Sequence, residues 1–230
     1  MKELELGGKI YKVLSETPLA HGGNQICYEL NLSDSVIIDD IPYNNLLCKR
    51  NLNGNGIDSK SLDVFKKLKK FNIATVEFML EAIYDHQKVL ITENLNNRES
   101  KRIYVSSNYH PKDERIEKLL AILQQRPYKE DHNEKSKEFY LSNNKLDEIK
   151  NYEQVIKCLK GLSKLCTEKR VFFPEDAIFF GVNTEKQSID DVLLGDYGSI
   201  IIDASDCDST VNENAIRTAI EEFKMHFVKE

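Results

Sequence analysis

The chain has no long apolar run, no paired cysteine motif and no excess of basic residues, and each absence excludes a class of protein. Nothing in it approaches the roughly eighteen consecutive apolar residues of a membrane-spanning helix. Its first residues, MKELE, lack the basic start and apolar core of a secretory signal. The five cysteines are scattered and never form a CxxC pair, which argues against a zinc site and a disulfide framework. We therefore expect a soluble protein of a reducing, cytoplasmic compartment, and no signal for delivery into a host cell is legible.

The charge balance argues against a nucleic-acid partner. The formal net charge is −6, with 32 Lys and Arg against 38 Asp and Glu. Binding to a phosphate backbone needs a basic surface that releases counterions. The 230 residues are 40% hydrophobic and 30% charged, which is enough apolar material for one domain or two small lobes.

The segment from residue 170 to 202 predicts a β-hairpin with a carboxylate at each edge. Two apolar runs, 177–180 and 192–194, flank a polar turn. Asp176 stands just before the first run, and Asp196 follows the second after one glycine. Two carboxylates at neighbouring strand ends suit Mg²⁺, which takes its other ligands from water and substrate phosphates. An ordinary surface hairpin with solvated acidic edges explains the same pattern.

The first half of the chain predicts strands with one helix among them. Residues 59–71 place apolar side chains along one side of a helix, with lysines away from them. The glycine pair Gly22 and Gly23 lies between two strand-like segments, where it permits close approach to phosphate oxygens or simply forms a hairpin turn. The predicted strands are residues 9–14, the second half of 18–30, 45–50, 76–82 and 89–92. A further amphipathic helix is predicted over residues 152–166, ahead of the hairpin.

In this order the elements resemble the protein-kinase superfamily. The P-E-D at 174–176 is similar to the family's P-E-N before a hairpin, with Asp176 in the asparagine position. The D-Y-G that begins at Asp196 replaces D-F-G. Gly22 takes the middle position of the glycine-rich loop, although the first and third glycines are replaced. The resemblance covers about residues 9–228 as a series of short matches, and it looks most like compact, degenerate members such as minimal effector kinases and pseudokinases.

The resemblance implies a set of nucleotide-binding residues. Lys49 would hold phosphates, with Arg50 as the rival cation and an edge lysine that blocks strand pairing as the alternative role. Thr92 would lie beside the adenine pocket, and Glu93 would begin the crossover to the second lobe. Asp196 and Asp176 would hold Mg²⁺, and ATP would be the ligand. The implied fold is a two-lobed α+β protein, with a small β-rich N-lobe at 1–95 and a truncated, mostly helical C-lobe at 96–230.

The sequence also departs from the family at three positions. The helix at 59–71 has no glutamate to pair with Lys49, and Asp63 is the acidic residue nearest that position. In the register set by P-E-D, Val171 replaces the proton-accepting aspartate. An alternative register makes Asp176 the catalytic base and puts Gly181 in the metal-ligand position. No A-P-E motif follows the D-Y-G.

These departures favour a pseudokinase, which binds nucleotide and acts through protein–protein contacts. One alternative is an active Mg²⁺-dependent ATP phosphotransferase with a protein substrate, or a nucleotidyl transferase. The other alternative is an unrelated α+β binding domain. No expectation follows for the oligomeric state.

Overall fold

The computed structural model describes residues 2–21, 25–52, 56–98, 102–106, 150–174, 177–183, 185–203 and 210–217. The chain divides into two compact units. The first consists of Met1–Lys67 and Val76–Arg98, and the second of Leu68–Thr75 and Glu99–Glu230.

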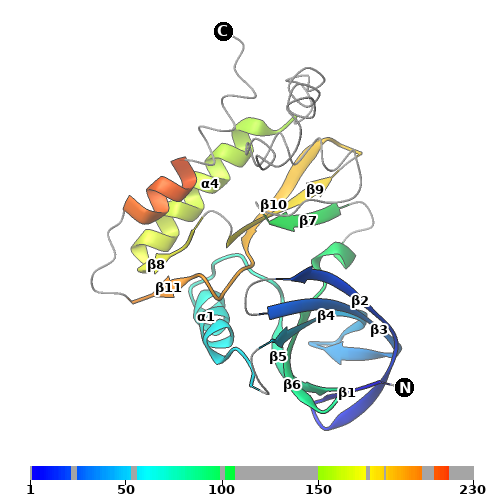
Figure 1. Ribbon diagram of the computed structural model, residues 1–230. Coiled ribbons are helices and arrows are strands. Elements are labelled where there is room, and N and C mark those ends of the chain that lie inside the picture. The colour runs from blue at the N-terminus through cyan, green and yellow to red at the C-terminus, as the bar shows by residue number, and fades with distance from the viewer. Residues whose placement is uncertain are drawn as a thin grey trace, which may run out of the picture. The chain divides into compact units, whose positions relative to one another are not determined.

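Six strands of the first unit close into an antiparallel barrel (Figure 1), in the order β1, β2, β3, β4, β6, β5 and back to β1. Closure depends on β1, which pairs with two strands: Leu4 lies opposite Tyr11 of β2 and opposite Tyr84 of β5. A sheet closed in this way leaves no strand unpaired on one side. The strands are β1 (Glu3–Leu6), β2 (Lys9–His21), β3 (Gln25–Ile38), β4 (Ile41–Asn51), β5 (Met79–Tyr84) and β6 (Gln87–Glu93).

Alternate residues of the strands fill the barrel interior. On β4 these include Leu46 and Cys48, and on β6 they include Val89 and Ile91. Because successive side chains of a strand point to opposite faces, the residues between them point to the outer face of the barrel. The buried interior cluster consists of Leu4, Leu6, Val13, Leu30, Leu32, Val36, Leu46, Cys48, Phe78, Ala82, Tyr84, Val89 and Ile91.

The predicted helix is confirmed as α1 (Ser59–Lys70), between β4 and β5. Its start is fixed by Asp58, whose Oδ1 accepts a hydrogen bond from the Ser61 amide at 3.1 Å. Leu62 and Phe65 are buried and the lysines after them are exposed, as the helical periodicity predicts. The division between the two units falls within this helix.

The described part of the second unit contains a three-stranded antiparallel sheet in the order β10, β9, β7. The predicted hairpin is confirmed as β9 (Ile178–Asn183) and β10 (Ser188–Leu194), and β7 (Arg102–Ser106) pairs with β9. The predicted helix before it is confirmed as α4 (Tyr152–Glu168). Two short strands, β8 (Val171–Phe172) and β11 (Ile201–Ile202), pair with each other.

The two-lobed kinase-like α+β fold expected from the sequence is wrong. The described residues are mostly strand, and the first unit is a closed barrel. Helix among them is limited to α1, α4, the single turn η1 (Leu95–Asn97) and residues 210–217. Helical spacing of apolar residues also predicts a helix at 114–125 and another at 215–228. The first lies outside the described residues, and of the second only residues 215–217 are described, as helix. Within the described ranges, no helix is long and apolar enough to cross a membrane.

The physical reason for the error is that the order of local elements does not specify how a sheet closes. The closing strand β1 has only 4 residues, too few to show a clear alternation in the sequence. The strands β2, β3 and β4 have 13, 14 and 11 residues, longer than their apolar patterns predicted. Closure requires the strands to tilt and their registers to stagger around the barrel, and neither can be read from local apolar patterns.

Candidate functional site

Lys49 and Thr92 lie on the same outer face of the barrel. Lys49 of β4 is opposite Leu90 of β6, and Leu47 is opposite Thr92. Their neighbours Cys48 and Ile91 belong to the interior cluster, so these four side chains point outward. Lys49 and Thr92 are therefore a diagonal pair across adjacent strands, within reach of one long side chain.

Asp58, which the sequence analysis did not select, is the acidic residue near Lys49. Its Oδ2 accepts hydrogen bonds from Gln25 Nε2 at 2.8 Å and from Ser61 Oγ. Partial burial opposes ionisation, but the hydrogen bonds from Ser61 and Gln25 and the charge of Lys49 outweigh it, so the pKa of Asp58 lies below its usual value. Asp58 is therefore a carboxylate held in place beside a cation.

The candidate from the sequence, Asp63, is exposed on α1. The kinase-like pattern places the acidic partner of Lys49 within the helix, whereas the acidic residue near Lys49 precedes it. A capping signal was present, because an aspartate directly before an amphipathic run is typical of a helix start. That signal predicts the cap and not the neighbouring lysine, which comes from the preceding strand β4.

Cys27 of β3 continues the row across the outer face, directly opposite Lys49. Burial raises the pKa of the Cys27 thiol, and the charge of Lys49 offsets part of this effect. The thiol is therefore protonated at neutral pH. The row Cys27, Lys49, Leu90 crosses three strands and carries one cation between a neutral thiol and an apolar side chain.

A chain of side-chain amides lies on the same outer face. Asn45 of β4 donates to Asn31 Oδ1 of β3 at 2.6 Å, and Asn31 donates to Ser15 Oγ of β2 at 2.9 Å. The Asn45 carbonyl oxygen accepts from Asn97 Nδ2 at 2.9 Å and from Asn94 Nδ2. We refer to Asn31, Asn45, Asn94 and Asn97 as the amide ladder. It adds hydrogen-bonding groups of both kinds to the face that carries Lys49.

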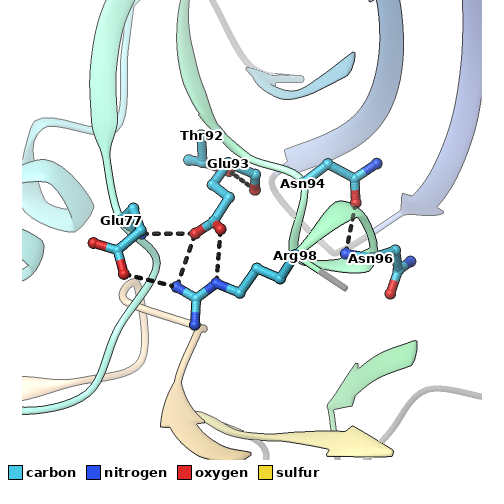
Figure 2. A network of polar contacts seen from close by, with 6 residues as sticks. All are labelled: Glu77, Thr92, Glu93, Asn94, Asn96 and Arg98. Carbon is cyan, nitrogen blue, oxygen red and sulfur yellow. Dashed lines mark hydrogen bonds and ion pairs between the residues drawn. The ribbon is translucent and has the colours of Figure 1, made fainter. Parts of the chain in front are cut away.

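Glu93 is held by its neighbours in a network of polar contacts (Figure 2). Its Oε1 accepts from Arg98 Nε at 2.7 Å, and its Oε2 accepts from Arg98 Nη2 at 2.9 Å and from the Glu77 amide at 2.7 Å. The Thr92 hydroxyl donates to the Glu93 carbonyl at 3.2 Å. These contacts occupy the carboxylate of Glu93 and hold the end of β6 in place. A ligand that contacted Glu93 would therefore contact its backbone.

Asp196 is an exposed residue of the second unit, just after β10. Its carbonyl accepts a hydrogen bond from Ser199 Oγ at 2.9 Å. The preceding Gly195 passes so close to Phe179 that an added Cβ would lie 2.5 Å from the ring, which explains the glycine at this position.

The remaining predicted site residues, Gly22, Gly23 and Asp176, lie outside the described residues. Within the ranges that are described, no group of three or more His, Cys, Asp and Glu side chains could hold a metal ion. The structure thus brings Lys49 and Thr92 together on one face and adds Asp58, Cys27 and the amide ladder to them.

Comparisons with known proteins add no family, because no protein-family model and no curated protein matches the chain.

Proposed function

We propose that this protein binds a nucleotide, with Lys49 as the phosphate contact, and that it acts through a partner protein and not as an enzyme. The observation that carries the proposal is the common outer face of Lys49 and Thr92, with Asp58 beside the lysine. The proposal takes its ligand, ATP, from the kinase-like motifs and does not depend on a two-lobed fold.

The setting of Lys49 supports a role in binding phosphate. The residue is half-buried in the middle of a paired region, between Cys27 and Leu90 on the neighbouring strands. A lysine that only blocks edge pairing would belong on an unpaired strand. Lys49 instead lies on a strand that is paired on both sides, and its flexible stem can carry the ammonium to an anion at the outer face.

The accessible apolar residue of this face beside Lys49 is Leu47, which is half-buried. Leu90 and Thr92 are 1% and 2% exposed, so they would meet a ligand only after the groups that cover them had moved. Small-molecule sites combine such apolar surface with a few placed polar groups. The amide ladder lies beyond Leu47 on the same face, and its central Asn45 amide is already hydrogen-bonded to Glu29, Asn31, Asn94 and Asn97.

Mg²⁺ would be held by Asp196 and Asp176 in this proposal. The carboxylate of Asp196 is exposed, which suits a cation that keeps several water ligands.

The environment of Val171 supports a non-catalytic function. This residue, which replaces the family's proton acceptor, is fully buried in β8 and lies opposite Ile202 of β11. Its aliphatic side chain has no group that could accept a proton.

The test is a thermal-shift titration with ATP, with and without Mg²⁺, because a ligand of the folded state raises the melting temperature. We expect a saturable rise in the native protein and its loss in Lys49→Met. Lys88→Met is the matched control, since it removes the charge of an exposed lysine from β6, and it should keep the rise. An unchanged melting temperature up to roughly 5 mM ATP would refute the proposal.

A further inference from the structure

The barrel interior becomes polar at one end. On the inward face of β4, Arg50 follows the apolar Leu46 and the thiol of Cys48. Tyr84, at the end of β5, is wholly buried, and Glu16 of β2 lies beside it. Arg50, Tyr84 and Glu16 form what we call the polar end of the barrel.

The guanidinium of Arg50 is held between two aromatic rings. Its Cζ lies 5.6 Å from the ring centroid of Tyr28 and 5.3 Å from that of Tyr84. Attraction to the two rings fixes the group in the interior. Its Nε and Nη2 atoms are buried and have no hydrogen-bond partner among the described residues. These two atoms form one edge of the guanidinium, which matches the paired oxygens of a carboxylate.

Two further polar atoms at this end, Glu16 Oε1 and Tyr84 Oη, are buried and lack a hydrogen bond of good geometry within the described ranges. The two side chains lie close enough for a weak hydrogen bond to each other, which contributes to the raised pKa of Tyr84, so the fully unpartnered atoms are those of Arg50. The other oxygen of Glu16 forms an ion pair with Lys2 Nζ, which also lies 5.7 Å from the Tyr84 ring centroid. Burial, reinforced by the Glu16 carboxylate, raises the pKa of Tyr84, so its hydroxyl stays protonated.

The grouping of these atoms requires a physical account. A buried polar atom without a partner has lost its hydration and gained nothing in return, and native proteins seldom hold several in one place. The charges of the groups described here are also unbalanced, because Lys2 and Arg50 are cations and the carboxylate of Glu16 pairs with Lys2. One small anion would correct both deficits.

We propose that the polar end of the barrel binds a small hydroxycarboxylate, of which glycolate is the simplest. Its carboxylate would accept from Nε and Nη2 of Arg50. Its hydroxyl would donate to Glu16 Oε1, and Tyr84 Oη would donate to one of its oxygens. A barrel of this size is largely filled by side chains, so the ligand must be small.

Access to the site is through the ion pair of Lys2 and Glu16. Their side chains are 45% and 16% exposed. Ion pairs in contact with water contribute little to stability, so this contact can open without unfolding the barrel. The proposed site is separate from Lys49, which points to the opposite face of the same strand.

The first experiment is a thermal-shift titration with glycolate at constant ionic strength, with acetate and chloride as controls. We expect a saturable rise with glycolate, a smaller one with acetate, which lacks the hydroxyl, and none with chloride. Arg50→Lys keeps the charge but loses the paired donors, and Tyr84→Phe loses only the hydroxyl. Both should reduce the rise, whereas Lys49→Met should keep it. A rise of equal size in Arg50→Lys would contradict the proposal.

A second experiment is an NMR titration of the native protein, so its result does not depend on whether a variant folds. The Nε–Hε resonance of Arg50 in the ¹⁵N-labelled native protein should move saturably as glycolate is added. If neither this resonance nor the melting temperature changes up to roughly 10 mM glycolate, the proposal fails. This outcome would leave the nucleotide proposal untouched, because ATP binding is assigned to Lys49 and glycolate binding to Arg50.

Discussion

Lys49 and Arg50 are adjacent in the sequence and point to opposite faces of β4. The lysine lies on the outer face near Asp58 and Cys27, and the arginine lies in the interior between two tyrosine rings. The sequence offered both as phosphate-binding cations. The face assignment separates them, because it depends on which neighbours are buried in the finished barrel.

At the scale of single residues, the lowered pKa of Asp58 predicts a pH dependence of stability. A carboxyl whose pKa is lower in the folded protein than its ordinary value of 3.8 stabilises the fold above that pH. This contribution is lost as the pH falls through the folded-state pKa. Unfolding free energies from urea titrations at about pH 3 to 6 should fall more steeply for the native protein than for Asp58→Asn.

Asp63→Asn is the control, since Asp63 is exposed on the same helix. Its pH profile should follow that of the native protein. If Asp58→Asn and Asp63→Asn gave identical profiles, the placement of Asp58 beside Lys49 would be wrong.

The cysteines should differ in reactivity. Burial raises the pKa of Cys48 and of Cys166 to about 12, whereas Cys158 is exposed. Because the thiolate is the reactive form, iodoacetamide at about pH 8 should modify Cys158 first and the other two at least ~10-fold more slowly. Peptide mapping by mass spectrometry measures the order. Rapid modification of Cys48 in the folded protein would show that the barrel interior is open.

At the scale of elements, β1 holds the barrel closed. Leu4 is completely buried and lies between Tyr11 and Tyr84 of the two strands that β1 joins. We predict that Leu4→Ala lowers the unfolding free energy by about 2–5 kcal/mol, because it leaves a cavity at the closing strand. Denaturant unfolding measures the change.

Glu5→Ala is the matched control, because Glu5 is the next residue of β1 and is exposed on the outer face. It should change stability by no more than about 0.5 kcal/mol. Equal effects of the two substitutions would mean that β1 contributes no buried face.

Elements with their own periodicity could be predicted from the sequence, and those that depend on distant partners could not. Leu62 and Phe65 recur at helical spacing, so α1 was predictable, and Phe180 and Val192 belong to apolar runs that predicted the hairpin. Glu3–Leu6 is too short for such a signal, and its role depends on Tyr84. The same holds for the candidate site: Lys49 was identified from its own strand, but Asp58 became a candidate only once the fold placed it nearby.

For the whole molecule, we predict that phosphoryl transfer from ATP to protein acceptors is absent. Val171 cannot accept a proton, and a positioned acid or base contributes typically ~10²–10⁴-fold to such reactions. The purified protein, incubated with labelled ATP, Mg²⁺ and a cell extract, should label no acceptor beyond the level of an Asp196→Ala variant. Labelling that disappears in that variant would establish an active transferase, and the mass of the added group would distinguish phosphate from AMP.

The pairing of Leu4 with Tyr84 also has a kinetic consequence. Contacts between residues about 80 positions apart form slowly, because the intervening chain loses conformational entropy before the contact contributes any stabilising free energy. During synthesis β1 is made well before β5, so it must wait for its partner while the central strands assemble. Any ligand of the barrel interior would therefore meet its site only after this late step, and closure would set the rate at which a newly made chain becomes competent to bind.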